Sequence, residues 1–322
     1  MRFLIVGAGG IGCYYGARLL QAGHQVSLVA RGEHLQALQQ QGLRLEHEQG
    51  GFQGAVSAVD IDTLLVQSAC ADFDLIILTL KSQATAGVMA QLGDWLKQAD
   101  TPILSLQNGV DNESEISRWV GDARTLGGLA VRIGGHIIAP GVVHADGPAQ
   151  VVMGAWPRQA EPLAGFLPAL EQLFEQAAIP TRISSDIRKE LWRKLIINNG
   201  VNPLSALTGL DTRSLSHDPC LGQSVYQMMN ETALVARADQ VELDRQDVEE
   251  MFTLIRNFDA IKTSMLVDKE KGRPLELDAI SGAVLRRAER LGVATPVTRL
   301  VVGLLSLSQG ASAVYEARPD KQ

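Results

Sequence analysis

Apolar and polar positions follow two different patterns along the chain. In the first part, short apolar runs typical of buried parallel strands alternate with stretches of helical periodicity. The runs cover residues 2–6, 25–30, 74–80 and 102–106, and a helix is expected over 11–21. Strands that alternate with helices predict a doubly wound parallel sheet with right-handed crossovers.

The pattern changes further along the chain. Between residues 133 and 154, glycine and proline pairs separate short β-branched runs, which predicts antiparallel strands. A helix is expected over 162–178 and a last strand over 180–183. From there on only helical patterning remains, in segments near 186–202, 218–240, 245–267 and 274–291. We therefore predict an α/β protein with a sheet domain over 1–184 and an all-helical domain over 185–322.

Composition narrows the class of protein. The 322 residues suit two domains, and a hydrophobic fraction of 46% with 20% charged residues is typical of a globular protein. The net charge of −7, without a Lys/Arg cluster, argues against a nucleic-acid partner. No run approaches the roughly 18 apolar residues of a membrane span. An anionic substrate would have to be met by particular lysine and arginine residues.

The cysteines and the N-terminus indicate the compartment. Cys13, Cys70 and Cys220 are far apart and have no metal-ligand spacing. The first residues lead directly into a strand and a glycine-rich turn, without the apolar stretch of a signal peptide. These features predict a reduced, cytoplasmic protein without a metal site.

A glycine motif lies between the first strand and the first helix. Its G-x-G-x-x-G pattern is formed by Gly7, Ala8, Gly9, Gly10, Ile11 and Gly12. The first glycine allows a tight turn, the second lets the backbone approach a pyrophosphate, and the third lets the helix pack on the strand. A purely structural glycine turn is the alternative. The position in a strand–turn–helix unit favours dinucleotide binding, and hence a Rossmann-type N-terminal domain.

The end of the second strand indicates which dinucleotide is bound. An NAD site usually has an acidic residue there, whereas this chain has Arg31, whose planar guanidinium suits a phosphate. Lys81, after the strand over 74–80, could add a second positive charge. We therefore predict NADPH/NADP+ as cofactor. The alternatives are a solvated Arg31, an Arg31 paired with Glu33, and a Lys81 without a role in binding.

A polar stripe marks the first long helix after the sheet domain. Lys194, Asn198 and Asn202 are spaced i, i+4 and i+8, which places them within about 80° on one helix face. Buried polar groups need partners, so an amine and two amides on an apolar helix suggest a ligand. A lysine ammonium could protonate a ketone oxygen and stabilise its charge during hydride transfer. Alternatively, Lys194 lies on the surface and the helix frays before Pro203, which disfavours helix at Asn202.

A second polar cluster follows downstream. Ser264 is expected at the end of one helix, and Glu276 at the start of the next. A carboxylate near Lys194 would keep that amine protonated and oriented. Taken alone, Glu276 would be an exposed residue at a helix start. The six histidines form no motif of a His-based dehydrogenase, which argues against lactate- or malate-type chemistry.

Together these motifs resemble the ketopantoate reductase (2-dehydropantoate 2-reductase) family along nearly the whole chain. The resemblance lies in GAGGIG at 7–12, ARGEHLQALQQQGL at 30–43, TLKS at 79–82, QNGV at 107–110, WRKLIINNGVNPLSAL at 192–207, TSMLVD at 263–268 and LELDAISG at 275–282.

The resemblance implies a role for each site residue. Lys194 would be the proton donor, and Glu276 would support it and approach the nicotinamide ribose. The substrate would contact Asn108, Lys194, Asn198, Asn202 and Ser264. The cofactor would contact the glycine motif, Arg31, Lys81, Asn108, Gly135 and Glu276.

The implied reaction is the NADPH-dependent reduction of 2-dehydropantoate to pantoate, a step towards pantothenate and coenzyme A. The chain departs from the family at Thr212, Thr263 and Val267, so reduction of another branched or aromatic 2-oxoacid is an alternative. Two further alternatives are a hydroxyacid dehydrogenase of the 6-phosphogluconate superfamily and a non-catalytic NADPH sensor. We expect a small-molecule 2-oxoacid as partner, neither nucleic acid nor membrane, and a monomer or homodimer.

Overall fold

The central strands of the N-terminal part bury both of their faces. In β1 (Arg2–Val6), Phe3 and Ile5 point into one hydrophobic core, and Leu4 and Val6 into a second. The same alternation holds in β6 (Leu75–Leu78) and β7 (Ile103–Ser105). Because successive side chains of a strand point to opposite faces, the sheet must be covered on both sides.

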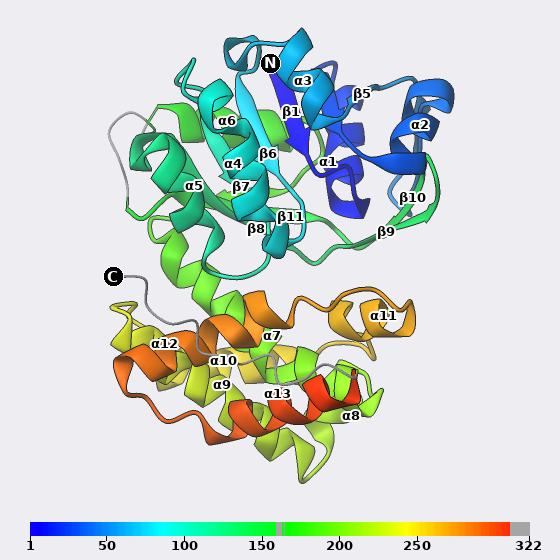
Figure 1. Cartoon of the computed structure of the whole chain (residues 1–322). Coiled ribbons are helices and arrows are strands. Elements are labelled where there is room, and N and C mark those ends of the chain that lie inside the picture. The colour runs from blue at the N-terminus through cyan, green and yellow to red at the C-terminus, as the bar shows by residue number, and fades with distance from the viewer. Residues whose placement is uncertain (159–162, 164, 310–322) are drawn as a thin grey trace. The chain divides into compact units, whose positions relative to one another are not determined.

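The computed structural model describes residues 1–158, 163 and 165–309 (Figure 1). In this part of the chain, eight strands form the main sheet, in the order β12-β11-β8-β7-β6-β1-β2-β5. All neighbouring pairs are parallel except β8 with β11. The remaining strands of this sheet are β2 (Gln25–Val29), β5 (Ser57–Val59), β8 (Thr125–Val131), β11 (Gln150–Ala155) and β12 (Thr181–Ile183).

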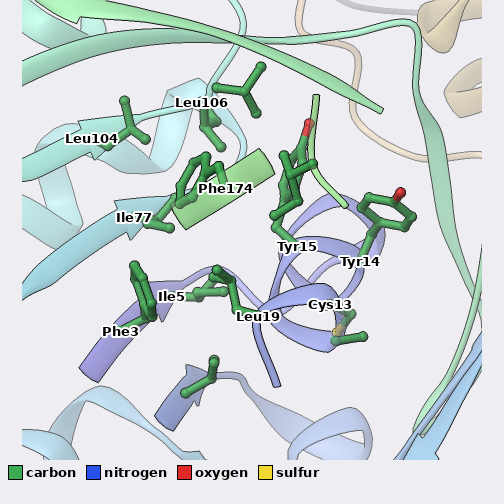
Figure 2. Packing of buried hydrophobic residues seen from close by; sticks show 14 of the residues in the cluster. Phe3, Ile5, Cys13, Tyr14, Tyr15, Leu19, Ile77, Leu104, Leu106 and Phe174 are labelled. Atoms are coloured by element: carbon green, nitrogen blue, oxygen red, sulfur yellow. The ribbon is translucent and has the colours of Figure 1, made fainter. Parts of the chain in front are cut away.

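A smaller sheet lies against α1 (Gly10–Gln21) and has the order β4-β3-β10-β9. Its strands are β3 (Leu43–Glu46), β4 (Phe52–Gly54), β9 (Gly134–Ala139) and β10 (Val142–Asp146). The core on this side joins β1, α1 and α6 (Phe166–Gln176); Figure 2 shows Phe3, Tyr15, Leu19 and Phe174 packed there.

The other core lies beneath three helices on the opposite face of the main sheet. It combines side chains of α3 (Ile61–Gln67), α4 (Thr85–Leu96) and α5 (Asn112–Val120) with the strands. The short helical segments η1 (Cys70–Asp72), η2 (Ser82–Ala84) and η3 (Asp122–Arg124), together with α2 (Gly32–Gln41), complete this part. The predicted Rossmann-type sheet domain is confirmed.

The C-terminal part contains only helices among its described residues. They are α7 (Ile187–Thr208), α8 (Thr212–His217), α9 (Leu221–Ala238), α10 (Arg245–Arg256), α11 (Ser264–Glu270), the π-helical η5 (Asp278–Gly282), α12 (Ala283–Leu291) and α13 (Pro296–Ser308). None of the helices in the described ranges is both long and apolar enough to span a bilayer. The predicted fold class, an α/β domain followed by an all-helical one, is confirmed.

The chain divides into two compact units, Met1–Glu190 and Leu191–Gln322. The division lies inside α7 rather than at residue 184, where the sequence pattern changes from strand to helix. The first turn of α7 belongs to the first unit because Ile187 is fully buried against its sheet. A Cβ at Gly127 or Gly154 would lie only 3.0 Å from the Ile187 side chain.

Two local predictions were wrong. The helix over 245–267 is broken, because α10 ends at Arg256 and Thr263 caps a new helix by accepting the Leu266 N–H. Ser264 therefore begins a helix instead of ending one. The helix expected near 186–202 continues to Thr208 with Asn202 buried, so the alternative of a helix that frays before Pro203 is wrong. The first part of the helix expected over 162–178 lies partly outside the described residues.

Candidate active site

In the glycine turn, the fold requires glycine at some positions, whereas at Gly9 it does not. Gly7 has φ +110°, and a Cβ there would lie 2.7 Å from the Leu80 nitrogen. A Cβ at Gly12 would overlap the Gly7 carbonyl. By contrast, Gly9 has no atom within 4 Å of an added Cβ, although it is the N-cap of α1. The space beside Gly9 therefore fits an anion at a helix N-terminus, as a dinucleotide pyrophosphate would require.

Gly135 lies against the same turn. A Cβ on Gly10 would overlap the backbone of Gly135 and His136 in β9. The two backbone segments therefore approach so closely that there is no room for a side chain between them. Ala8 is buried within the turn, and Ile11 is half-buried. All of the glycine-motif residues and Gly135 are thus brought together in the first unit.

Four loops that carry predicted site residues leave the same edge of the main sheet. The strands β7, β6, β1 and β2 are parallel neighbours, so their carboxyl ends share one edge. Asn108 follows β7, Lys81 follows β6, the glycine turn follows β1, and Arg31 follows β2. In open α/β sheets this edge is where ligands bind.

Arg31 is exposed and forms the N-cap of α2. Within the described ranges, it makes no ion pair with Glu33, one of the alternatives left open by the sequence. Its guanidinium is therefore available to solvent or to a ligand. Lys81 is also exposed and precedes η2.

A polar network holds the Asn108 loop to the Lys81 loop. The Asn108 carbonyl accepts hydrogen bonds from the Ser82 hydroxyl and from the Asn112 amide, the latter at 2.8 Å. The Thr85 hydroxyl donates to Asn112 Oδ1 at 2.9 Å, and Gln107 Nε2 donates to Thr85 Oγ1 at 2.8 Å. Because these groups are largely buried, the network fixes both loops at the sheet edge.

Gln107 extends this network to the end of β6. Its amide nitrogen also donates to the Leu80 carbonyl at 2.9 Å, directly before Lys81. Its Oε1 atom is buried without a hydrogen-bond partner. The loops that carry Lys81 and Asn108 are thereby held by side chains from one cluster.

In the helical unit, the predicted stripe lies on α7 as expected. Lys194 and Asn198 are half-buried and Asn202 is buried, so these polar side chains belong to a largely buried helix.

The rotation of α7 within its unit is fixed by polar contacts from neighbouring helices. Arg193 forms ion pairs with Asp247 and with Glu250 of α10, the latter at 2.8 Å. Asn199, fully buried, donates to Thr232 Oγ1 of α9 at 2.9 Å and to Thr298 Oγ1 of α13 at 3.3 Å. These contacts fix the direction in which the Lys194 face of α7 points within the helical unit.

The downstream cluster is placed at two helix starts. Ser264 is exposed in the first turn of α11, and Glu276 lies just before η5. Glu276 is 6% exposed, so the alternative of an exposed residue at a helix start is wrong. A carboxyl group buried in this way points to a role inside the protein rather than to solubility.

Comparison with known families covers both units. The model described as ketopantoate reductase PanE/ApbA matches residues 3–158, and the corresponding C-terminal model matches residues 186–309. The chain belongs to the ketopantoate reductase family. It is therefore an oxidoreductase of the class that acts on CH–OH groups.

Individual relatives of the ketopantoate reductase family match over nearly their full length. The 2-dehydropantoate 2-reductase of Pyrococcus abyssi is 28% identical over 310 residues, which is 95% of this chain and 97% of that protein. The crystal structure of 2-dehydropantoate 2-reductase from Methylococcus capsulatus is 30% identical, with a TM-score of 0.82, and covers 97% of this chain and 99% of its own. A D-mandelate dehydrogenase structure shares the fold, with a TM-score of 0.87 at 24% identity over 96% and 99% of the two chains.

Sequence reasoning missed the residues that position the site of this ketopantoate reductase family member. Ser82, Thr85, Gln107 and Asn112 flank the predicted Lys81 and Asn108. A possible signal was their position within the TLKS and QNGV motifs (Ser82 and Gln107) or a few residues after them (Thr85 and Asn112). Their partners could not be assigned, because the two loops are distant in sequence and meet only when β6 pairs with β7.

Proposed function

We propose that this protein reduces the ketone of 2-dehydropantoate to the hydroxyl of pantoate, with NADPH as cofactor. The observation that carries the proposal is Lys194, a half-buried amine on the largely buried helix α7 of a ketopantoate reductase family member. The names of the curated relatives support 2-dehydropantoate as the substrate. Its place would be the cytoplasmic synthesis of pantothenate and coenzyme A.

The N-terminal unit has the features that a nicotinamide dinucleotide requires. Gly9 leaves open space at the α1 N-terminus, which suits the pyrophosphate. Arg31 would hold the 2′-phosphate that distinguishes NADPH from NADH, Lys81 would add a second positive charge, and Asn108 would lie between cofactor and substrate. When bound, the nicotinamide supplies the hydride, and the remaining chemistry belongs to side chains of the protein.

In the proposed reaction, Lys194 donates a proton to the ketone oxygen as that oxygen becomes an alcohol. Its positive charge also stabilises the negative charge that develops on the oxygen. Glu276 would keep the amine protonated by electrostatic attraction. Asn198, Asn202 and Ser264 would hold the substrate's carboxylate and hydroxyl groups, and Gly135 would contact the cofactor through its backbone.

A second candidate substrate is another branched or aromatic 2-oxoacid. Thr212 stands where some family members are expected to have a substrate-binding asparagine. Here Thr212 is buried, and its hydroxyl donates to the Asp259 carbonyl at 3.3 Å while its N–H donates to the Ile261 carbonyl at 3.0 Å. Because the Thr212 hydroxyl is bonded to the segment between α10 and α11, this position favours a changed substrate pocket, and the D-mandelate dehydrogenase fold is compatible with this.

Arg31→Ala tests the cofactor part of the proposal. We expect the Kd of NADPH to rise by about 10- to 100-fold, because charge-assisted hydrogen bonds to the 2′-phosphate are lost. The Kd of NADH, which lacks this phosphate, should stay within about twofold by the same argument. Both are measured by titration of nicotinamide fluorescence.

Arg44→Ala is the matched control, since Arg44 is an exposed arginine paired with Glu46 in the same unit. Its binding of both nucleotides should equal that of the wild type. An equal loss of NADPH and NADH affinity in Arg31→Ala would argue against a 2′-phosphate site at Arg31.

A further inference from the structure

His34 lies where three segments of the cofactor half meet. It is half-buried in the first turn of α2, shortly after Arg31. The Gly141 N–H, in the turn between β9 and β10, donates to His34 Nδ1 at 3.1 Å. On its other side Nε2 lies within hydrogen-bonding distance of Cys13 Sγ, at 3.7 Å, and the Cys13 thiol in turn donates to the backbone carbonyl of Ala8 in the glycine turn.

These contacts define the protonation state of His34. Because Nδ1 accepts an N–H, the proton of the neutral ring is on Nε2, which then donates towards Cys13 Sγ. Burial lowers the pKa of His34 below its usual value, which favours the neutral ring. Burial also raises the pKa of the Cys13 thiol to about 12, so this neighbour stays neutral and donates to the Ala8 carbonyl at 3.4 Å.

The hairpin of β9 and β10 connects the same two places by a second route. At Gly135 it packs against Gly10 of the glycine turn, and at Gly141 it bonds to His34. The Gly141 carbonyl also accepts the Arg44 N–H of β3 at 2.9 Å, which fixes the turn of the hairpin. The start of α2 is therefore tied to the glycine turn by two routes, one through Cys13 and the other through this hairpin.

We propose that His34 is a positioning residue for cofactor choice: it fixes the distance between the glycine turn and Arg31. The glycine turn would bind the pyrophosphate that NADPH and NADH share, whereas Arg31 would bind the 2′-phosphate of NADPH alone. A correct distance between these two positions therefore increases the affinity for NADPH but not for NADH. The inference rests on the proposed use of NADPH, and it goes further by assigning part of the selectivity to a residue outside the glycine motif and Arg31.

Three substitutions separate the two bonds of His34. His34→Gln extends an amide nitrogen to the position of Nε2 and can keep the bond to Cys13 Sγ. His34→Asn places an amide near Nδ1 and can keep only the bond to Gly141, and His34→Leu keeps neither. Gln36→Leu, an exposed position on the same helix, is the matched control. The Kd of NADPH and of NADH is measured for each protein, together with the Tm of the cofactor-free form.

We expect His34→Leu to reduce the NADPH preference, the ratio of the two Kd values, by about 3- to 10-fold, as for the loss of one or two hydrogen bonds. His34→Gln should recover most of this ratio and His34→Asn should not, whereas Gln36→Leu should match the wild type. If His34→Leu does not fold, the comparison of the glutamine and asparagine variants decides.

Two results would overturn the inference while leaving the proposed function intact. One is a His34→Leu protein with lower Tm and an unchanged NADPH preference, which would make His34 a packing residue only. The other is a glutamine variant no better than the asparagine variant. If the wild-type protein shows no NADPH preference, the proposed cofactor itself is wrong and this inference falls with it.

Discussion

Replacement of Lys194 by alanine is expected to lower kcat by a factor of ~10² or more, because the ketone oxygen loses its proton donor and its nearby positive charge. The Kd of NADPH should remain within about twofold, since the cofactor's phosphate contacts are proposed to lie in the N-terminal unit. Single-turnover oxidation of NADPH in the presence of 2-oxoacid, followed by absorbance, measures the chemical step directly.

Two further variants make the Lys194 result specific. Lys194→Arg keeps the charge, but its guanidinium does not release a proton at neutral pH, so kcat should stay low. Lys97→Ala removes an exposed lysine that is paired with Asp94, and it should behave as the wild type. A Lys194→Ala enzyme with wild-type kcat would eliminate Lys194 as the proton donor.

The second large effect is expected at the glycine turn, where Gly9 and Gly10 should respond differently to alanine. Gly10→Ala would drive a methyl group into the backbone of Gly135 and His136, which cannot move aside like a side chain. We expect a loss of stability of about 3 kcal/mol or more, at the upper end of overpacking effects. Chemical unfolding followed by circular dichroism measures this change in the free energy of unfolding.

Gly9→Ala is the matched substitution next to it. Gly9 has φ −81° and open space around the added methyl, so the free energy of unfolding should change by less than about 1 kcal/mol. Its Kd for NADPH should nevertheless rise by about 10-fold or more, because the methyl group would occupy the approach of the pyrophosphate. A stable Gly9→Ala protein with unchanged NADPH affinity would contradict a cofactor site at this turn.

Elements with a strong local pattern could be predicted from the sequence. The strand β1 has an uninterrupted apolar run because both of its faces are buried, and α1 begins at the glycine motif. In contrast, β3, β4 and β5 are short strands with exposed or half-buried positions. They form only because they pair with strands formed elsewhere in the chain, such as β10 and β2. Such pairing has no local signal.

The candidate site shows the same limit. Lys194, Asn198 and Asn202 could be proposed together because their spacing along one helix is a local property. The contacts of Asn199 with Thr232 and Thr298 depend on how three helices pack, and those of His34 depend on a hairpin about a hundred residues away. Residues proposed to touch a ligand could thus be found by motif, whereas the residues that hold them in place could be found only in the tertiary structure.

The proposed reaction is best tested by the initial rate of NADPH oxidation with 2-dehydropantoate, compared with the rates for NADH and for branched and aromatic 2-oxoacids. We expect kcat/KM to be highest for 2-dehydropantoate with NADPH, by about 10-fold or more over the other combinations. A higher kcat/KM for an aromatic or another branched 2-oxoacid would show that the substrate is a different 2-oxoacid, reduced by the same chemistry. If the protein binds NADPH but does not oxidise it in the presence of any of these 2-oxoacids, the proposed reduction of a 2-oxoacid is wrong.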